Sequence, residues 1–491
     1  MSACCLHADA MLSPVPAPET PAPPAVRLPK SVTHFGLNSI ALVIVLATMY
    51  AMRTGILKVR DPIMTLVAAV AVPVVLFDVF ILRVHRRETT GLDWDKDFSP
   101  SFERVVTKLA GFVLTLVPFG AAYWVFPEYG GTFYTPFYTL LGRFWIGLVP
   151  STILYVTIVD GHMCAPRDAY WQLGRVAIGK WRDANGAEIA NHYRGWLVKA
   201  FFFPLMFVWL NNSTNNVVHF DLTNASWANL RAYDFLYDFI FFIDLLFTTV
   251  GYALCFRPID THIRSAEPTF LGWGVALFCY EPFFSGLFEK QYVRYGGIGF
   301  GGWLGEHPQL RWAWAIAILS LITIYVLGTV AFGVRFSNLT HRGILTNGPY
   351  RFTKHPAYIS KNLSWWLVSV PFIVTADGPL SAIKRCLALS CVNFMYYMRA
   401  RTEERHLSRD PTYVEYALWM NEHGTLRLLN RIPFVRRLAA YVPPDQALPL
   451  AGAFSLWPSG QALAAAQDPG EEVPPLGEPR EDRPDGEAGG V

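Results

Sequence analysis

Long apolar segments follow one another along most of this chain, and they restrict what it can fold into. A helix that spans a membrane needs about 20 mostly apolar residues, and shorter runs are tolerated where aromatic residues flank them. Only 16% of the 491 residues are charged, against about 25% in an ordinary soluble domain. The candidate spans are 35–52, 63–82, 109–126, 144–158, 197–210, 235–256, 270–288, 312–332, 363–374 and 383–398. The sequence therefore predicts an all-α, polytopic, integral membrane helical bundle with about 10 transmembrane helices.

The basic residues between these segments predict an orientation. Lys and Arg are retained preferentially on the cytoplasmic side of a membrane. Eighteen of them lie in alternate connections, whereas the opposite connections hold eight. The basic connections are 83–108, 159–196, 257–269 and 335–362. We therefore expect both termini, and the helix that follows residue 398, to be cytoplasmic, although the first connection, with Arg53, Lys58 and Arg60, departs from the rule.

Composition also divides the chain. Residues 1–30 form a Pro-rich leader that we expect to be flexible, and residues 441–491 form an acidic tail that lacks the apolar surface to fold. Between them we expect an N-terminal transmembrane bundle of unknown role over 31–310 and a distinct C-terminal region over 311–440. The low charge content excludes a nucleic-acid-binding protein. Seven cysteines without paired spacing imply neither a disulfide framework nor a metal site.

The connection over 335–362 differs from the others because it combines histidines, tyrosines and basic residues. Pro356 restricts His355 to an extended backbone, so the imidazole is held in place. Farther along, helical spacing puts Tyr396, Arg399, Glu403 and Leu407 on one face, with Glu404 on the adjacent face. Aromatic rings attract cations, and carboxylates bind amino and ribose groups. Together these residues predict a site for a cationic, ring-bearing cofactor.

These elements resemble a known pattern. The isoprenylcysteine carboxyl methyltransferase family and the related phospholipid methyltransferases carry G-x-Y, R-H-P-x-Y, a helical hairpin, E-E and Y-x-x-Y in this order. The corresponding residues here are Gly348-Pro349-Tyr350, Lys354-His355-Pro356-Ala357-Tyr358, Glu403-Glu404, Tyr413 and Tyr416. The resemblance covers about 337–416 and is specific because several elements recur in the right order.

The resemblance implies methyl transfer from S-adenosylmethionine at the cytoplasmic membrane face to a lipophilic acceptor, an isoprenylcysteine carboxylate or a lipid-like molecule. The acceptor would enter from the bilayer, so membrane lipids are the expected partners. By position, the walls of the cofactor pocket would be Tyr350, His355, Pro356 and Tyr358. Glu403 and Glu404 would take the amino and ribose groups of the cofactor, or orient the residues that do.

The acceptor decides which residues are expected to be catalytic. A carboxylate is already nucleophilic and needs a cation to hold it, for which Arg399 is the candidate. An amine would need a base, for which Glu415 or His355 is suited. The chain departs from the family pattern at Lys354, which replaces an Arg, and at Ser360-Lys361-Asn362, which replaces small and apolar residues. It also lacks the basic residue that prenylcysteine enzymes tend to carry after the second motif tyrosine.

Two other functions fit parts of the sequence. Sterol and steroid reductases that use NADPH share a similar loop, hairpin and terminal helix, but their R-H-x-N-Y and Cys-x-x-K-Y-G elements are missing here. A transporter or scaffold would agree with the many spans, although no internal repeat supports it. Ionisable residues inside spans are costly and often functional. Asp78, Asp238 and Asp244 are such residues, and they either line an acceptor pocket, pair with basic residues or lie near span ends.

Overall fold

The computed structural model describes residues 27–443, apart from 222, 224, 227–229, 281–282, 285, 287–298, 371–377, 434–435 and 437–439. Most of the predicted leader and most of the predicted acidic tail lie outside the described residues, as does the tip of the predicted apolar hairpin. The described part is mostly helical with almost no sheet, which confirms the predicted all-α class.

Nine α-helices precede residue 280 in the described part of the chain. They are α1 (Phe35–Arg53), α2 (Pro62–Leu76), α3 (Phe102–Val125), α4 (Pro127–Gly130), α5 (Thr135–His162), α6 (Ala169–Ala177), α7 (Gly186–Val218), α8 (Arg231–Ala253) and α9 (Phe270–Leu277). The C-terminal helices are α10 (Phe300–Trp303), α11 (Pro308–Phe332), α12 (Pro356–Ser369), α14 (Pro379–Leu407) and α15 (Pro411–His423). Two short strands, β1 (Ser265–Ala266) and β2 (Thr340–His341), pair antiparallel.

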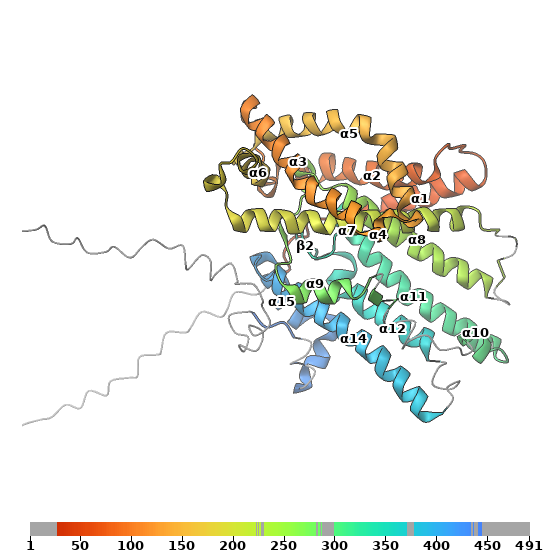
Figure 1. Ribbon diagram of the computed structural model, residues 1–491. Coiled ribbons are helices and arrows are strands. Elements are labelled where there is room, and N and C mark those ends of the chain that lie inside the picture. Colours follow the sequence, from red (N-terminus) through yellow and green to blue (C-terminus); the bar gives the residue numbers. More distant parts are fainter. Residues whose placement is uncertain are drawn as a thin grey trace, which may run out of the picture.

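The long helices form a bundle with α8 near its centre. Helix α8 packs against α7 and α11, and α11 also packs against α12 and α1. Figure 1 shows α1 to α5 on one side of the bundle and α11, α12 and α14 on the other, with α7 and α8 between them. Phe242, Leu246 and Phe247 of α8 are fully buried against Ile318 and Ile322 of α11. This shared core joins the C-terminal helices to the N-terminal bundle.

Within the described part of the chain, six helical segments are long and apolar enough to cross a membrane. They are Phe35–Arg53, Pro62–Ile81, Phe102–Val125, Thr132–His162, Arg231–Ala253 and Pro308–Arg335. The predicted spans 197–210 and 383–398 lie inside α7 and α14, which are long enough but less apolar. The segments 270–288 and 363–374 fall partly outside the described residues. The count of ten and the cytoplasmic placement of the termini stay predictions.

Helices α3 and α6 cross at unusually close range. A Cβ atom added at Gly111 of α3 would lie 1.8 Å from the carbonyl oxygen of Tyr170, and one added at Gly174 of α6 would lie 1.9 Å from that of Thr107. Real Cβ atoms essentially never approach so closely. Two glycines on facing helices therefore allow the backbones to touch, as small residues do between membrane helices.

Candidate functional site

A cavity of about 160 Å³ lies between the C-terminal end of α11, the segment that follows it, and helices α12, α14 and α15. Its walls come from segments that are far apart in the sequence, from Glu267 to Tyr416. The segment 335–345 forms one wall, and the first turns of α12 and the last turns of α14 form others. The cavity therefore depends on the packing of several helices and not on one loop.

The structure brings most of the predicted site residues to this cavity. Its lining includes Tyr350, His355, Tyr358, Arg399 and Glu403. Their roles toward a ligand stay predictions.

Three predicted residues do not line the cavity. Pro356 is the buried first residue of α12, and Glu404 is buried behind the wall. Glu415 is exposed on α15. A direct contact between any of these three and a ligand in the cavity has no support from the geometry.

Glu404 holds a cluster of positive side chains together. Its Oε1 atom lies 2.6 Å from Nζ of Lys354 and 3.1 Å from Nε2 of His355, and its Oε2 atom lies 2.5 Å from Arg401. Burial alone would raise the pKa of Glu404, but the hydrogen bond from His355 and the nearby charges of Lys354, His355 and Arg401 lower it to about 2. The ionised carboxylate thus orients Lys354 and His355, which do line the cavity.

Glu403, the other member of the acidic pair, faces the cavity. It accepts a hydrogen bond of 2.7 Å from the hydroxyl of Tyr358. The ring of Tyr358 stacks on the imidazole of His355, with ring centroids 5.4 Å apart and planes 8° from parallel. One carboxylate of the pair therefore presents a negative group to the cavity, while the other fixes the imidazole beside it.

Arg399 is buried and surrounded by aromatic rings. Its guanidinium carbon lies 5.2 Å from the ring centre of Tyr358, 5.6 Å from that of Tyr280 and 5.9 Å from that of Tyr396. The side-chain oxygen of Asn338 accepts a hydrogen bond of 2.5 Å from the guanidinium. Arg399 is thus a cation held in a fixed direction at the cavity wall.

Asn338 is itself fixed by two tyrosines. Its amide nitrogen donates to the hydroxyl of Tyr252 at 2.8 Å and to that of Tyr280 at 2.9 Å. Neither Asn338 nor Tyr280 was among the predicted site residues, because no local pattern marks them. Only the fold brings residues 252, 280, 338 and 399 together.

Two tyrosines of α15 close the cavity on another side. The hydroxyl of Tyr416 donates to the carbonyl oxygen of Tyr350 at 2.6 Å and so ties α15 to the turn Gly348–Arg351. The hydroxyl of Tyr413 is buried at the cavity and has no hydrogen-bond partner in the described part of the chain. A buried hydroxyl without a partner costs free energy, which a polar ligand in the cavity would recover. The Y-x-x-Y spacing was the sequence signal for Tyr413.

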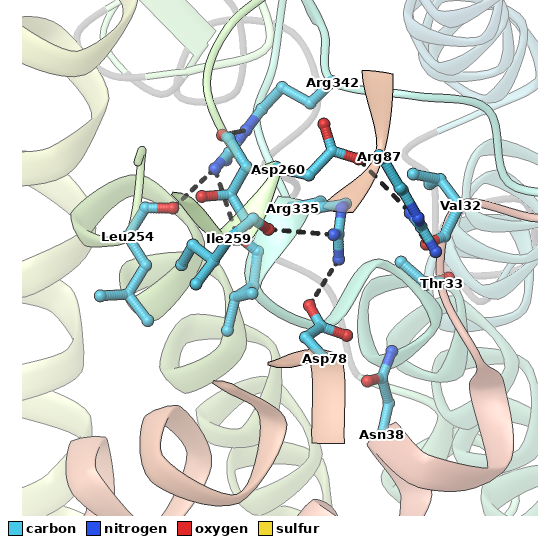
Figure 2. A network of polar contacts seen from close by, with 12 residues as sticks. Val32, Thr33, Asn38, Asp78, Arg87, Leu254, Ile259, Asp260, Arg335 and Arg342 are labelled. Carbon is cyan, nitrogen blue, oxygen red and sulfur yellow. Dashed lines mark hydrogen bonds and ion pairs between the residues drawn. The ribbon is translucent and has the colours of Figure 1, made fainter. Parts of the chain in front are cut away.

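The wall 335–345 is anchored by two buried arginines. Arg342 donates to the carbonyl oxygens of Thr261, Gly251 and Leu254 at 2.6 to 2.8 Å. It also donates to the carbonyl oxygens of Phe336 and Val334. Arg335 forms an ion pair of 2.7 Å with Asp78 of the N-terminal bundle and donates to the carbonyl oxygen of Ile259. Figure 2 shows the Arg335 guanidinium between these two partners.

The three intramembrane aspartates have different surroundings. Asp78 pairs with Arg335, as one of the predicted alternatives has it. Asp244 accepts hydrogen bonds from Tyr325 at 2.7 Å and from Thr329 at 2.5 Å, and these two residues line the cavity. Asp238 is exposed on α8. Asp78 and Asp244 thus each contact a residue that lines the cavity.

The start of the described chain also packs on the site. The backbone of Val32 bonds to that of Ile344 at 3.0 Å, and the amide of Asn347 donates to the carbonyl oxygen of Thr33 at 2.6 Å. Gly343 has φ +106°, and a Cβ atom there would lie 2.7 Å from Val32. Residues 1–30 are predicted to form a flexible leader, and the residues that directly follow it support the cavity wall.

A comparison with protein families found a match in the C-terminal part of the chain. The model of the isoprenylcysteine carboxyl methyltransferase (ICMT) family matches residues 311–409, which confirms the resemblance seen in the C-terminal part of the sequence. The matched part contains most of α11 and all of α12 and α14. Searches of curated proteins and of solved structures found no match. The match and the apolar helices together support an integral, multi-pass membrane protein with a membrane methyltransferase region.

Proposed function

We propose that this protein transfers a methyl group from S-adenosylmethionine to a lipophilic acceptor at the cytoplasmic face of a membrane. One observation carries the proposal: motif residues from the turn 348–351, from α12, from α14 and from α15 line a single cavity. The family match over residues 311–409 covers three of these four segments. The acceptor that we propose is an isoprenylcysteine carboxylate or another lipid-like molecule.

The residues at the cavity suit this methyl donor. Its amino group and ribose hydroxyls need acceptors, and Glu403 offers a carboxylate oxygen there. Its sulfonium is a cation, which the faces of Tyr350 and Tyr358 can attract. The hydroxyl of Tyr413, which has no hydrogen-bond partner among the described residues, can donate to a ring nitrogen or to a carboxylate. These four side chains together support a binding site for the methyl donor in the cavity.

When bound, the donor supplies a methyl group activated by its positively charged sulfur. The contribution of the protein is then to hold both reactants in line, which can account for most of the acceleration in such a displacement. Arg399, held by Asn338 and the surrounding rings, would bind an acceptor carboxylate. His355 would be the nearer base for an amine acceptor, because it lines the cavity whereas Glu415 is exposed.

Equilibrium binding of S-adenosylmethionine to the detergent-purified full chain tests the proposal. We expect saturable binding by wild type, weakened about tenfold in Glu403→Gln and in Tyr413→Phe, since each removes one hydrogen bond to the donor. Glu422→Gln and Tyr397→Phe are matched controls because neither residue lines the cavity. NADPH is added as a competitor to distinguish a reductase. Folded wild type that binds no donor, or binds NADPH instead, would overturn the proposal.

A further inference from the structure

The residues that follow α15 combine exposed arginines with exposed apolar side chains. The chain continues there as a 3-10 helix over Thr425–Arg431. The exposed arginines are Arg427, Arg431 and Arg436. The exposed apolar side chains among them are Leu426, Leu428 and Ile432. Arginines that alternate with exposed apolar residues are typical of segments that lie in the interface between lipid headgroups and acyl chains.

Hydrogen bonds hold this segment near the end of a membrane span. The backbone N–H of Thr425 and its hydroxyl donate to the carbonyl oxygen of Phe352, at 2.9 and 3.0 Å. Asn347, earlier in the same connection, donates to the carbonyl oxygen of Thr33 at 2.6 Å. Thr33 lies just before the candidate span Phe35–Arg53 begins. The segment after α15 is therefore fastened to a connection that lies at a membrane surface.

This connection adds two exposed residues, Arg351 and Phe352, to the same surface. The side chain of Phe352 is 58% exposed. Phe352 lines a hollow of about 40 Å³ together with Leu426 and Arg427, so the connection and the segment after α15 are adjacent. The basic surface is defined here by Arg351, Phe352, Leu426, Arg427, Leu428, Arg431, Ile432 and Arg436.

The four arginines of the basic surface have no acidic partner in the described part of the chain. None of them forms an ion pair there with an Asp or Glu side chain. Lys354, which lines the same hollow, differs because Glu404 lies 2.6 Å from its Nζ atom. Like charges without partners repel one another, and anions at the surface remove that cost. The basic surface is therefore complementary to an anionic partner that also presents apolar groups.

We propose that the basic surface docks on anionic phospholipids of the membrane that the chain spans. Its arginines pair with the phosphate and carboxylate groups of the headgroups, while Phe352, Leu428 and Ile432 enter the layer of the first acyl carbons. Each basic residue close to an anionic membrane strengthens such binding about fivefold. Docking does not depend on methyl transfer, because none of the residues of the basic surface lines the cavity between α11, α12, α14 and α15.

Amide hydrogen exchange of the full chain in lipid nanodiscs tests the docking. One sample contains phosphatidylcholine alone, and a second contains phosphatidylcholine mixed with phosphatidylserine. We expect the amides of residues 425–433 to exchange about tenfold more slowly in the second sample, because bound headgroups oppose the local opening that exchange requires. Concentrated salt should abolish the difference, since it screens the attraction between exposed charges.

Variants of the arginines show whether their charge is responsible. Arg427→Gln combined with Arg431→Gln should reduce the difference between the two lipid samples to about twofold or less. Lysine at the same two positions should retain it, because the attraction needs the charge and not the guanidinium fork. Lys58→Gln combined with Arg60→Gln is the matched control, since both residues are exposed and follow the opposite end of the span Phe35–Arg53.

Three results would overturn the proposed docking. The first is equal and fast exchange of residues 425–433 in both lipid samples. The second is a difference that persists when Arg427 and Arg431 are both replaced by glutamine. The third is equally slow exchange in both samples, which would assign the basic surface to an anionic segment of the protein itself.

Discussion

Replacement of Glu404 by glutamine removes the one negative charge at the centre of the cluster of Lys354, His355 and Arg401. The carboxyl pKa falls from the ordinary 4.5 to about 2 in the folded chain. At about 1.4 kcal/mol for each tenfold change in proton affinity, this difference contributes about 3 kcal/mol to the free energy of unfolding. Loss of one partner of a buried ion pair costs a similar amount, about 3 to 5 kcal/mol.

The sign of the pH dependence follows from the lowered pKa. The stabilisation is fully present above pH 4.5 and is lost as the pH falls toward 2. In thermal unfolding of detergent-purified protein at pH 7, Glu404→Gln should unfold at a clearly lower temperature than wild type. At pH 3 the difference in free energy should shrink to about half.

Glu422→Gln is the control for Glu404→Gln, because Glu422 is exposed on α15. A Glu404→Gln protein as stable as this control at pH 7 would refute the reasoning. So would a stability difference that stays the same at pH 3, because a cluster held by the ionised carboxylate must weaken when that carboxylate is protonated.

Three other substitutions test the crossing of α3 and α6, the buried ion pair of Arg335 and the support of Arg399. Gly174→Ala should lower the free energy of unfolding by about 1–3 kcal/mol, because its Cβ atom would overlap the α3 backbone. Gly120→Ala is the control, since nothing lies within 4 Å of a Cβ atom there, and equal stabilities of the two variants would contradict the close crossing. Asp78→Asn should lower the free energy of unfolding by about 3 kcal/mol, because Arg335 stays buried without its ion-pair partner. Addition of Arg335→Met should restore part of that free energy, and additive losses in the double variant would exclude the coupling. Asn338→Leu should lower kcat/KM for methyl transfer about tenfold or more with little change in donor binding, because it removes the hydrogen bond that holds Arg399. A variant that loses only donor binding would contradict this role of Asn338.

Helical spacing was enough to predict which side chains of α14 act together. The face with Tyr396, Arg399, Glu403 and Leu407 was expected from the sequence, and all four residues line the cavity. The reason is physical, since residues three and four apart lie on one side of any straight helix. The order of the motifs could likewise be read directly, because it does not depend on how the helices pack.

The partners of the individual side chains depend on tertiary packing and could not be predicted from the sequence. Adjacent glutamates in a helix point in different directions, but only the position of α12 shows that Glu404 meets His355 while Glu403 meets the cavity. Asn338 carries no periodic or motif signal, and its role depends on tyrosines 86 and 58 positions away. Asp78 could be recognised as unusual from its apolar surroundings, but its partner Arg335 lies 257 positions along the chain.

The cavity wall also limits which truncated forms of the protein can contain the whole cavity. The family match begins at residue 311, yet Glu267, Cys279 and Tyr280 line the cavity, and Arg342 is held by carbonyls at the end of α8. A fragment expressed from residue 311 onward would contain every motif residue and still lack one side of the cavity. Transplantation of the C-terminal helices into another protein would therefore have to bring the end of α8 and the segment through Tyr280 with them.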